Sequence, residues 1–263
     1  MFRPLIKCHG GKFHLRDFVI SNFPTNYTEL EYTESCIGGG SIIINKLPSI
    51  KETISDCSYR LICLWIAVQD WPNQLKELLT DLYYSEDTFE RYKISEPKST
   101  LSIAIKEYVV KRQSRGGLGL NFSYGDRLRG GINGDENAWN NSIKNITIIS
   151  ERIKNIDIRC ESIVESLSRT LNNEKSFLYL DPPYICSSRI SPKAYEYEMT
   201  DKQHEEYLDL ANAHKGKLLI SGYWSKLYED KLSNWNIVKK SIVNHSSQQK
   251  HKQLKEEVLW KNY

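Results

Sequence analysis

Several features are absent from this 263-residue sequence. It has no C-x-x-C pair and no cysteine/histidine cluster with the spacing of zinc ligands, so we expect no metal and reduced cysteines. No apolar run is long enough to cross a bilayer, and the opening MFRPLIKCHGGK lacks the apolar stretch of a signal peptide. We therefore expect a cytoplasmic protein of a bacterium, an archaeon or a phage-infected cell. The six cysteines are Cys8, Cys36, Cys57, Cys63, Cys160 and Cys186.

The composition is that of a folded globular protein, with 40% hydrophobic and 26% charged residues. No internal repeat or low-complexity tract interrupts it. The formal net charge of +3 permits a polyanionic partner but does not identify one. The length suits one α/β core with a smaller inserted subdomain.

Short apolar runs alternate with amphipathic segments along much of the chain. The pattern predicts strands near 30–33, 53–55, 156–159, 177–180 and 217–221, and helices over 41–47, 58–68, 162–171 and 201–213. Thr200 and Gln203 form a capping-box pattern at the start of the last of these helices. The runs 237–243 and 257–260 predict a terminal antiparallel pair, joined by the polar, basic loop NHSSQQKHKQLK. Such alternation indicates a mostly parallel sheet covered on both faces.

The middle of the chain differs from its flanks. Helices are predicted at 73–83, 86–92, 100–112 and 138–153, around a loop-rich stretch that begins RGGLGLNFSYGD. We interpret residues 71–145 as a mostly helical insertion between core segments 1–70 and 146–263. Arginines here could bind phosphates or read guanine, with an aromatic beside them; the alternative is a solvated loop with scattered charge. These residues are Arg112, Arg115, Tyr124, Arg127 and Arg129.

Two motifs follow directly after predicted strands: the glycine cluster Gly38-Gly39-Gly40 and the tetrapeptide Asp181-Pro182-Pro183-Tyr184. In an α/β sheet, ligands bind at the carboxyl ends of the strands. We therefore expect both motifs on one rim of the sheet.

The tetrapeptide suits chemistry on a planar amine. The Asp181 carboxylate and the Pro182 carbonyl are two acceptors, and the prolines hold the backbone stiff. Two acceptors that face the amine hydrogens localise the nitrogen lone pair for attack on a sulfonium methyl group. Tyr184 offers a flat face on which a flipped base can stack. The alternative is a rigid turn at a strand end.

The glycine cluster lets the backbone approach a ligand closely, although it is not the G-x-G-x-x-G fingerprint and alone is equally typical of a flexible turn. Asp56, at the end of the second predicted strand, can accept hydrogen bonds from ribose hydroxyls. Glu161 could face the adenine of a cofactor or be a solvated charge. Near the amino terminus, the motif His9-Gly10-Gly11-Lys12 places Lys12 directly after a glycine pair. Lys12 is then either a cation of the site or an ordinary surface lysine.

Together these motifs resemble the Dam-like class of DNA adenine methyltransferases, particularly the short versions of phages and mobile elements. The family has a G-G-K start, a strand ending E-P-F-x-G-G-G, an acidic residue at the next strand end, a target-recognition insertion and D-P-P-Y. The resemblance spans nearly the whole chain. Smaller matches are Arg112 to Gly117, Tyr197 to Asp201, Leu219 to Tyr223 and Glu257 to Trp260.

The resemblance implies a Rossmann-like class I methyltransferase sheet with a terminal antiparallel strand and an inserted recognition subdomain. It also implies S-adenosylmethionine as methyl donor, with S-adenosylhomocysteine as product. The resemblance further implies direct transfer of the methyl group to the N6 amine of an adenine that is flipped out of double-stranded DNA. The enzyme is expected to act as a monomer or a dimer. The implied cofactor contacts are Cys8, His9, Gly10, Lys12, Glu34, Gly38, Gly40, Asp56, Glu161 and Asp181, and the implied catalytic residues are Asp181, Pro182, Pro183 and Tyr184.

Three departures separate this chain from that pattern. Cys8 stands where an aromatic is usual, Ser35-Cys36 replace Pro-Phe, and Glu161 replaces aspartate. None of these changes removes a group that methyl transfer needs. The alternatives are methylation of RNA adenine or of protein glutamine, where asparagine more often occupies the position of Asp181, and a non-catalytic DNA-binding relative.

Overall fold

The structure is a computed structural model that describes residues 2–129, 131–185, 197–243 and 254–263. The chain divides into two compact units. One contains residues 1–20, 37–47 and 58–160, and the other contains residues 21–36, 48–57 and 161–263. Each unit is described by itself.

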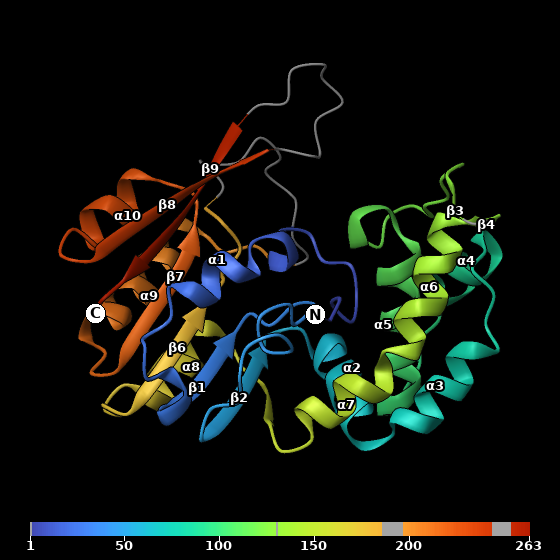
Figure 1. Cartoon of the computed structure of the whole chain (residues 1–263), viewed down its shortest axis with the longest axis horizontal. Coiled ribbons are helices and arrows are strands. Elements are labelled where there is room, and N and C mark those ends of the chain that lie inside the picture. The colour runs from blue at the N-terminus through green and yellow to red at the C-terminus, as the bar shows by residue number, and fades with distance from the viewer. Residues whose placement is uncertain (1, 130, 186–196, 244–253) are drawn as a thin grey trace. The chain divides into compact units, whose positions relative to one another are not determined.

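The second unit is built on a mostly parallel sheet. Its strands are β1 (Glu31–Ser35), β2 (Lys51–Asp56), β6 (Ser176–Leu180), β7 (Lys217–Gly222), β8 (Asn236–Val243) and β9 (Leu254–Lys261), in the order β2-β1-β6-β7-β9-β8. The strands β2, β1, β6 and β7 are parallel, and β9 pairs antiparallel with both β7 and β8. Figure 1 shows β1, β6 and β7 running side by side. This arrangement confirms the predicted sheet and its terminal antiparallel pair.

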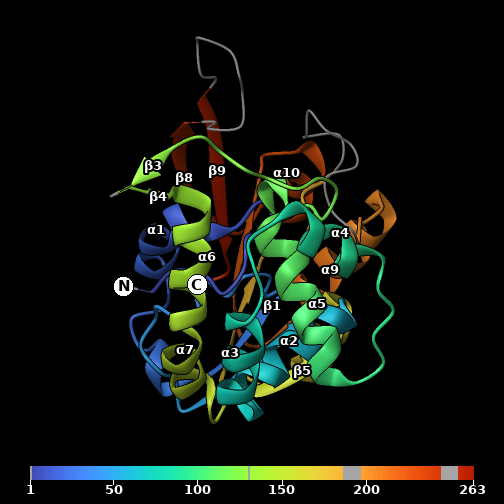
Figure 2. The same ribbon diagram turned by 90° about the vertical axis from the view of Figure 1, so that its right-hand side faces the viewer.

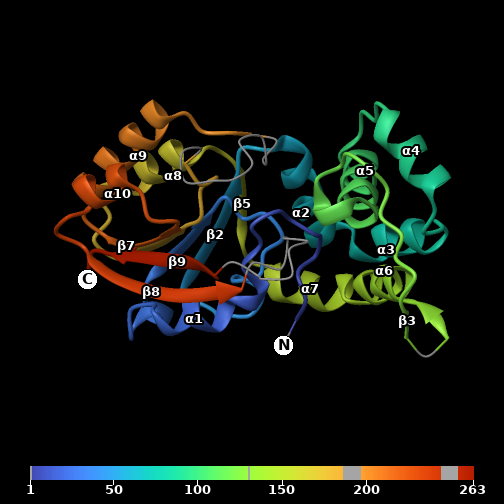
Figure 3. The ribbon, with the colours of Figure 1, turned by 90° about the horizontal axis from the view of Figure 1, so that it is seen from above.

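Helices of the second unit cover one face of its sheet. They are α8 (Ile163–Thr170), α9 (Asp201–Ala213) and α10 (Lys226–Lys231). Figure 3 shows all three on the same side of β7 and β9. Leucines and isoleucines at alternate positions of β6 and β7 pack with Tyr207, Leu208 and Trp260 in one core cluster. The predicted capping box of α9 is present: Thr200 accepts from the Gln203 backbone N–H, and the Gln203 side chain bonds back.

The opposite face of this sheet carries aromatic and polar residues. Phe23, Tyr32, Phe177 and Tyr179 form a cluster with ring centroids 4.7–6.2 Å apart. Because successive residues of a strand point to opposite faces, Glu34 lies on the same face of β1 as Tyr32. This face therefore brings hydroxyl and carboxylate groups toward the carboxyl ends of the strands.

The first unit is mostly helical. It contains α1 (Arg16–Ser21, whose last residue belongs to the second unit), α2 (Tyr59–Asp70), α3 (Pro72–Thr80), α4 (Glu86–Ile94), α5 (Thr100–Gln113), α6 (Gly134–Lys144) and α7 (Ile146–Ile153). Its strands are β3 (Leu128–Arg129), β4 (Ile132–Asn133) and β5 (Asp157–Cys160), and its 3-10 turns are Lys12–His14 and Arg115–Gly117. Helix α5 packs against both α2 and α4, and Figure 2 looks onto this group of helices.

Two predicted helices differ in the structure. Residues 41–46 form successive turns instead of a helix, because Asn45 directs its side chain to Ser41 and to the backbone of Phe2, and the three isoleucines before it are weak helix formers. The single helix expected over 138–153 is two helices, α6 and α7, that meet at Asn145. The helices α1 and α10 were not predicted from the sequence.

Two other expectations concern the described part of the chain. None of its helices is long and apolar enough to cross a membrane. Cys63 is buried in the core of the first unit, as expected for some of the cysteines. Cys186 and most of the predicted basic loop (residues 244–253) lie outside the described residues.

Candidate active site

The tetrapeptide lies where the sequence predicted it, at the carboxyl end of a buried strand. Every residue of β6 is buried, and Asp181 follows immediately. Strand β6 pairs in parallel with β1, with Leu180 opposite Ser35, and the Asp181 backbone N–H donates to the Ser35 carbonyl over 3.4 Å. Ser35 and Cys36, which precede the glycine cluster, thus lie beside Asp181 at one rim of the sheet.

The Asp181 carboxylate is held by a residue of the neighbouring strand. The Ser221 hydroxyl, fully buried on β7, donates to Asp181 Oδ1 over 2.7 Å. The Tyr179 hydroxyl lies 3.1 Å from Ser221 Oγ. Burial raises the pKa of Tyr179 well above its usual value, and the nearby charge of Asp181 adds to this effect. Tyr179 therefore stays neutral and can donate to Ser221, which orients the carboxylate.

Tyr184 is fastened in a similar way. Its hydroxyl donates to Oε1 of Glu257 on β9, and both residues are almost completely buried. Its ring and that of Tyr223 pack in a T-shaped pair, with ring centroids 4.5 Å apart and an interplanar angle of 71°. Burial, followed by the charges of Glu257 and Asp181, raises the pKa of Tyr184 well above its usual value. Tyr184 is therefore a hydrogen-bond donor with a fixed ring.

The two prolines support these side chains. Pro182 is buried and Pro183 is half-buried. Their rings fix the backbone φ angles, so the Asp181 and Tyr184 side chains leave a stiff segment. The structure thus combines a rigid backbone with side chains bonded to β7 and β9, which is the kind of preorganisation that the predicted chemistry requires.

Cys36 turns the chain sharply at the end of β1. Its φ of 62° lies in the left-handed region, the only such value among the described residues other than glycine. Burial raises the pKa of its thiol well above the usual value, and the charges of Asp56, Cys57 and Asp181 add to this effect. The thiol is therefore protonated near neutral pH and is a poor nucleophile.

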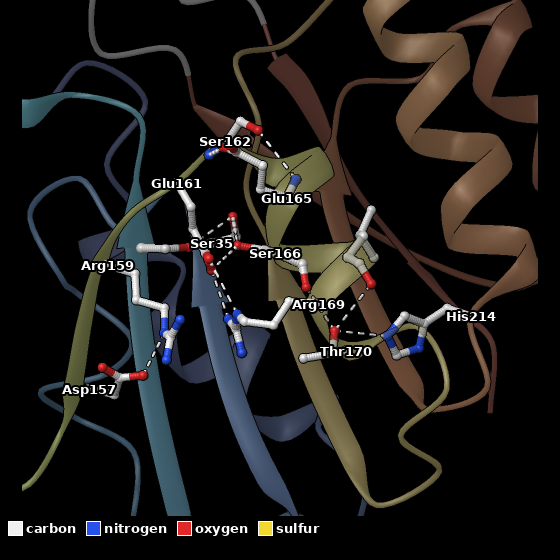
Figure 4. A network of polar contacts seen from close by, with 12 residues as sticks. Ser35, Asp157, Arg159, Glu161, Ser162, Glu165, Ser166, Arg169, Thr170 and His214 are labelled. Carbon is white, nitrogen blue, oxygen red and sulfur yellow. Dashed lines mark hydrogen bonds and ion pairs between the residues drawn. The ribbon is translucent and has the colours of Figure 1, made fainter.

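Asp56 and Glu161 lie next to each other in the second unit. The Glu161 backbone N–H donates to the Asp56 carbonyl over 3.1 Å. The Glu161 carboxylate accepts from the Ser166 hydroxyl over 2.8 Å and forms an ion pair with Arg169 at 2.7 Å. The Ser166 hydroxyl is 2.8 Å from that of Ser55 and 3.3 Å from that of Ser35. Figure 4 shows this network from the end of β1 to helix α8.

Glu34, a predicted cofactor contact, is also buried and bonded. The Tyr32 hydroxyl donates to Glu34 Oε2 over 2.9 Å, on the aromatic face of the sheet. Burial, together with the charge of Glu34, raises the pKa of Tyr32 well above its usual value. The carboxylates Glu34, Asp181 and Glu257 thus each accept a hydrogen bond from a hydroxyl group, of Tyr32, Ser221 and Tyr184 respectively.

The first unit brings the remaining predicted cofactor residues together. The Leu5 backbone N–H donates to the Gly39 carbonyl over 3.2 Å, so the segment that leads into Cys8 and His9 lies along the glycine loop. Cys8 is half-buried and His9 and Gly10 are exposed. Lys12 is buried, with its ammonium group 2.9 Å from the Gly10 carbonyl.

Packing alone explains part of the glycine cluster. Gly40 has a φ of 69°, and a Cβ atom there would lie 2.4 Å from the Trp65 ring. At Gly39 a Cβ atom would lie 2.9 Å from the Ile6 carbonyl oxygen. Both glycines thus permit close contacts within the first unit, whether or not they also admit a ligand.

The predicted DNA-binding arginines have different surroundings. Arg112 is buried, and its guanidinium donates to the carbonyls of Leu5 and Pro4 over 2.9 and 2.8 Å. Burial lowers the pKa of Arg112. This side chain therefore ties α5 to the amino-terminal segment. In contrast, Arg115, Tyr124 and Arg127 are exposed, whereas the Arg129 side chain lies outside the described residues.

Sequence reasoning missed the residues that hold the site together. Ser221 and Glu257 lie in matches that supported the family resemblance, but no role was predicted for either. Ser166 and Arg169 lie at i and i+3 on α8, on one side of the helix, and followed from no motif. The serine of the L-I-S-G-Y match could have been found as a small polar residue in an otherwise apolar strand. Among the described residues, no group of three or more histidine, cysteine or acidic side chains is suited to a metal ion.

The chain is similar to known proteins in sequence and, more weakly, in structure. The Type II methyltransferase M1.LlaDCHI of Lactococcus lactis subsp. cremoris is 29% identical over 262 residues, which cover 90% of this chain and 87% of that protein. Among solved structures, precorrin 8w decarboxylase of Methanobacterium thermoautotrophicum has a TM-score of 0.41 at 7% identity, covering 99% of this chain and 98% of its own. A SAM-dependent methyltransferase of Agrobacterium tumefaciens has a TM-score of 0.38 at 10% identity, covering 94% and 58%.

These structural scores are low, so the fold rests on the topology of the chain itself. The family match is broader: the profile of the D12 class of N6 adenine-specific DNA methyltransferases covers residues 9–246. That range includes the G-G-K start, the glycine cluster and the tetrapeptide. The chain therefore belongs to the D12 class of N6 adenine-specific DNA methyltransferases.

Proposed function

We propose that this adenine-specific DNA methyltransferase uses S-adenosylmethionine to methylate an adenine that is flipped out of double-stranded DNA. The observation that carries the proposal is the strand-end tetrapeptide, in which Ser221 orients the Asp181 carboxylate and two prolines hold the backbone. The membership in the D12 class supplies the reaction. The roles of individual residues are inferred from their chemistry.

The residues of the second unit fit a nucleoside-containing methyl donor. Asp56, at the end of β2, is half-buried and can accept from ribose hydroxyls, and the adjacent Glu161 can accept from an adenine amine. Bound S-adenosylmethionine would supply a sulfonium methyl group. The proposed cofactor contacts of the first unit are Cys8, His9, Gly10, Lys12, Gly38 and Gly40, and Glu34 is a further one in the second unit.

The chain's own groups would then prepare the target amine. The Asp181 carboxylate and the Pro182 carbonyl accept hydrogen bonds from the two N–H groups of the amine. These bonds favour a tetrahedral nitrogen, whose lone pair is available for attack on the methyl group. Transfer of the methyl group to this nitrogen would release S-adenosylhomocysteine, and one amine proton would pass to water during or after the transfer. Tyr184 stacks on the base and offsets the few kcal/mol that extrusion costs.

The proposed DNA contacts lie in the first unit. Arg115 and Arg127, with Tyr124, are exposed in the segment that follows α5, which suits phosphate or base contacts. Arg129 and Arg112 were predicted alongside them, but the burial of Arg112 is explained by its bonds to carbonyls. Residues 71–145 remain the proposed target-recognition insertion, within the longer segment 58–160 of the first unit.

The test measures both substrate and product. Genomic DNA from cells that express the protein is sequenced for methylated adenine, with Asp181→Ala as the comparison. In parallel, purified protein is incubated with tritium-labelled S-adenosylmethionine and DNA, RNA or protein. We expect the tritium label in DNA. Methylated adenine should occur at one recognition sequence in cells with the wild-type chain and should be absent in cells with Asp181→Ala. Label in RNA or protein alone would exclude the proposal, and absence of cofactor binding would favour a non-catalytic relative.

A further inference from the structure

Glu257 is a buried carboxylate for which neither the reaction nor the fold gives an evident need. It lies on β9 and is 1% exposed, and the three residues after it, Val258, Leu259 and Trp260, are buried and apolar. An ionisable side chain rarely occupies such a position, because removing a carboxylate from water is costly unless it is bonded. Its carboxylate accepts a hydrogen bond from the hydroxyl of Tyr184.

This contact joins the last strand of the sheet to the last residue of the tetrapeptide. Tyr184 and Glu257 are 73 residues apart, so the bond depends on the pairing of β9 with β7. With Glu257 at the hydroxyl and the Tyr223 ring in a T-shaped contact, the Tyr184 ring is held at two points. A hydrogen bond to a charged acceptor is directional and stronger than one between neutral groups.

We propose that Glu257 is a positioning residue for methyl transfer, which fixes the plane of the Tyr184 ring so that the flipped adenine stacks with its amine at Asp181. The inference rests on the proposed function and deepens it. The role of Ser221 is parallel, since it orients the Asp181 carboxylate from β7. Two neighbouring strands thus each hold one side chain of the tetrapeptide.

A purely structural role for the pair makes a different prediction. If Tyr184 served only to satisfy a buried carboxylate, replacing both partners by apolar residues of similar shape would leave stability and activity nearly unchanged. If Glu257 positions the ring, the same double replacement would leave the fold intact but slow the chemical step. The double variant Tyr184→Phe/Glu257→Leu separates the two roles.

The experiment compares wild type, Tyr184→Phe, Glu257→Leu and the double variant in single-turnover methylation of DNA. We expect the rate of methyl transfer to fall about tenfold in each, with the double variant no slower than either single one, because all three break the same bond. The Kd for DNA should change less than about threefold, since phosphate contacts dominate DNA affinity. The Kd for S-adenosylmethionine should stay within about twofold, because Glu257 acts on the stacked base alone.

Glu256→Gln is the matched control. Glu256 is the preceding residue on β9, exposed and paired with Lys239 at 3.0 Å, and its replacement should leave the rate unchanged. A folded double variant that transfers methyl groups at the wild-type rate would overturn the inference. If that variant did not fold, full activity of Tyr184→Phe would overturn it equally. A wild-type chain that methylates no DNA adenine would instead refute the proposed function.

Discussion

The end of β6 and the segment that follows Arg112, up to Arg127, hold their charged groups in opposite ways. At the end of β6, Asp181 and Tyr184 are each bonded to a buried residue of another strand. In the other segment, Arg115 and Arg127 are exposed to solvent. Transfer of a methyl group needs donors and acceptors placed before the reaction. Exposed cations suit phosphate contacts instead, which is the role proposed for Arg115 and Arg127.

Replacing Asp181 tests the rigid region most directly. Asp181→Ala removes one of the two proposed amine acceptors, so we expect methyl transfer to fall about a thousandfold or more, as when a preorganised polar group is deleted from an active site. The free energy of unfolding should change by less than about 1 kcal/mol, because Asp181 is only half-buried. Methylation rates and urea unfolding measure the two effects. Asp230→Ala, an exposed acidic residue on α10, is the control.

Turnover retained in Asp181→Ala would break the comparison, because the oriented carboxylate would then have no part in the chemistry. A large loss of stability without a specific loss of rate would have the same meaning. A specific loss of rate in a folded variant would sharpen it.

Arg112 and Arg115 test the second region as a matched pair. Arg112→Met leaves the Leu5 and Pro4 carbonyls without their donor, so we expect the free energy of unfolding to fall by about 2–4 kcal/mol. Arg115→Met should change that free energy by less than about 0.5 kcal/mol, because the side chain is exposed. It should weaken DNA binding and lower the slope of log K against log salt by about 1.

Urea unfolding and DNA binding at several salt concentrations measure both variants. If Arg112→Met left the free energy of unfolding unchanged and reduced the salt slope of DNA binding, Arg112 would be a DNA-binding residue like the exposed arginines. The contrast between a structural and a DNA-binding arginine within α5 and the turn after it would then fail.

Local patterns predicted much of the fold. The buried run that ends at Leu180 and the stiff turn of Pro182 and Pro183 predicted both β6 and the place of the tetrapeptide, because such runs depend on neighbours in sequence. The parallel direction of β1 and β6 followed from the general rule for α/β sheets, whereas their direct pairing was not predicted. The capping box at Thr200 was predicted because four consecutive positions suffice to define it.

Contacts between distant segments were beyond such patterns. Nothing near Arg112 indicates that its side chain turns inward while that of Arg115 stays exposed, because the partners of Arg112 are the carbonyls of residues 4 and 5. Ser221 and Glu257 become part of the site only when β7 and β9 pair. The turns at 41–46 were missed because Asn45 bonds to Phe2, 43 residues earlier in the chain.

Replacing Glu161 gives the smallest expected effect. It tests whether this bonded carboxylate binds the cofactor or only stabilises the fold. It is bonded to Ser166 and Arg169, and its side chain is 12% exposed. If its carboxylate receives the adenine amine of the cofactor, Glu161→Gln should raise the Kd for S-adenosylmethionine about tenfold, the effect of losing a charged hydrogen-bond acceptor. Arg169→Met should raise that Kd about threefold, because the carboxylate is then less firmly oriented.

Calorimetric titration of the cofactor measures these effects, and Glu165→Gln serves as the control. Glu165 lies on the same helix, is exposed, and only closes the capping box with Ser162, a role that glutamine can also fill. Unchanged cofactor affinity in Glu161→Gln, with a lower free energy of unfolding, would make Glu161 an anchor for α8. The bonded carboxylates would then have two purposes: those next to the tetrapeptide would serve the reaction, and the one beside Asp56 would serve the fold.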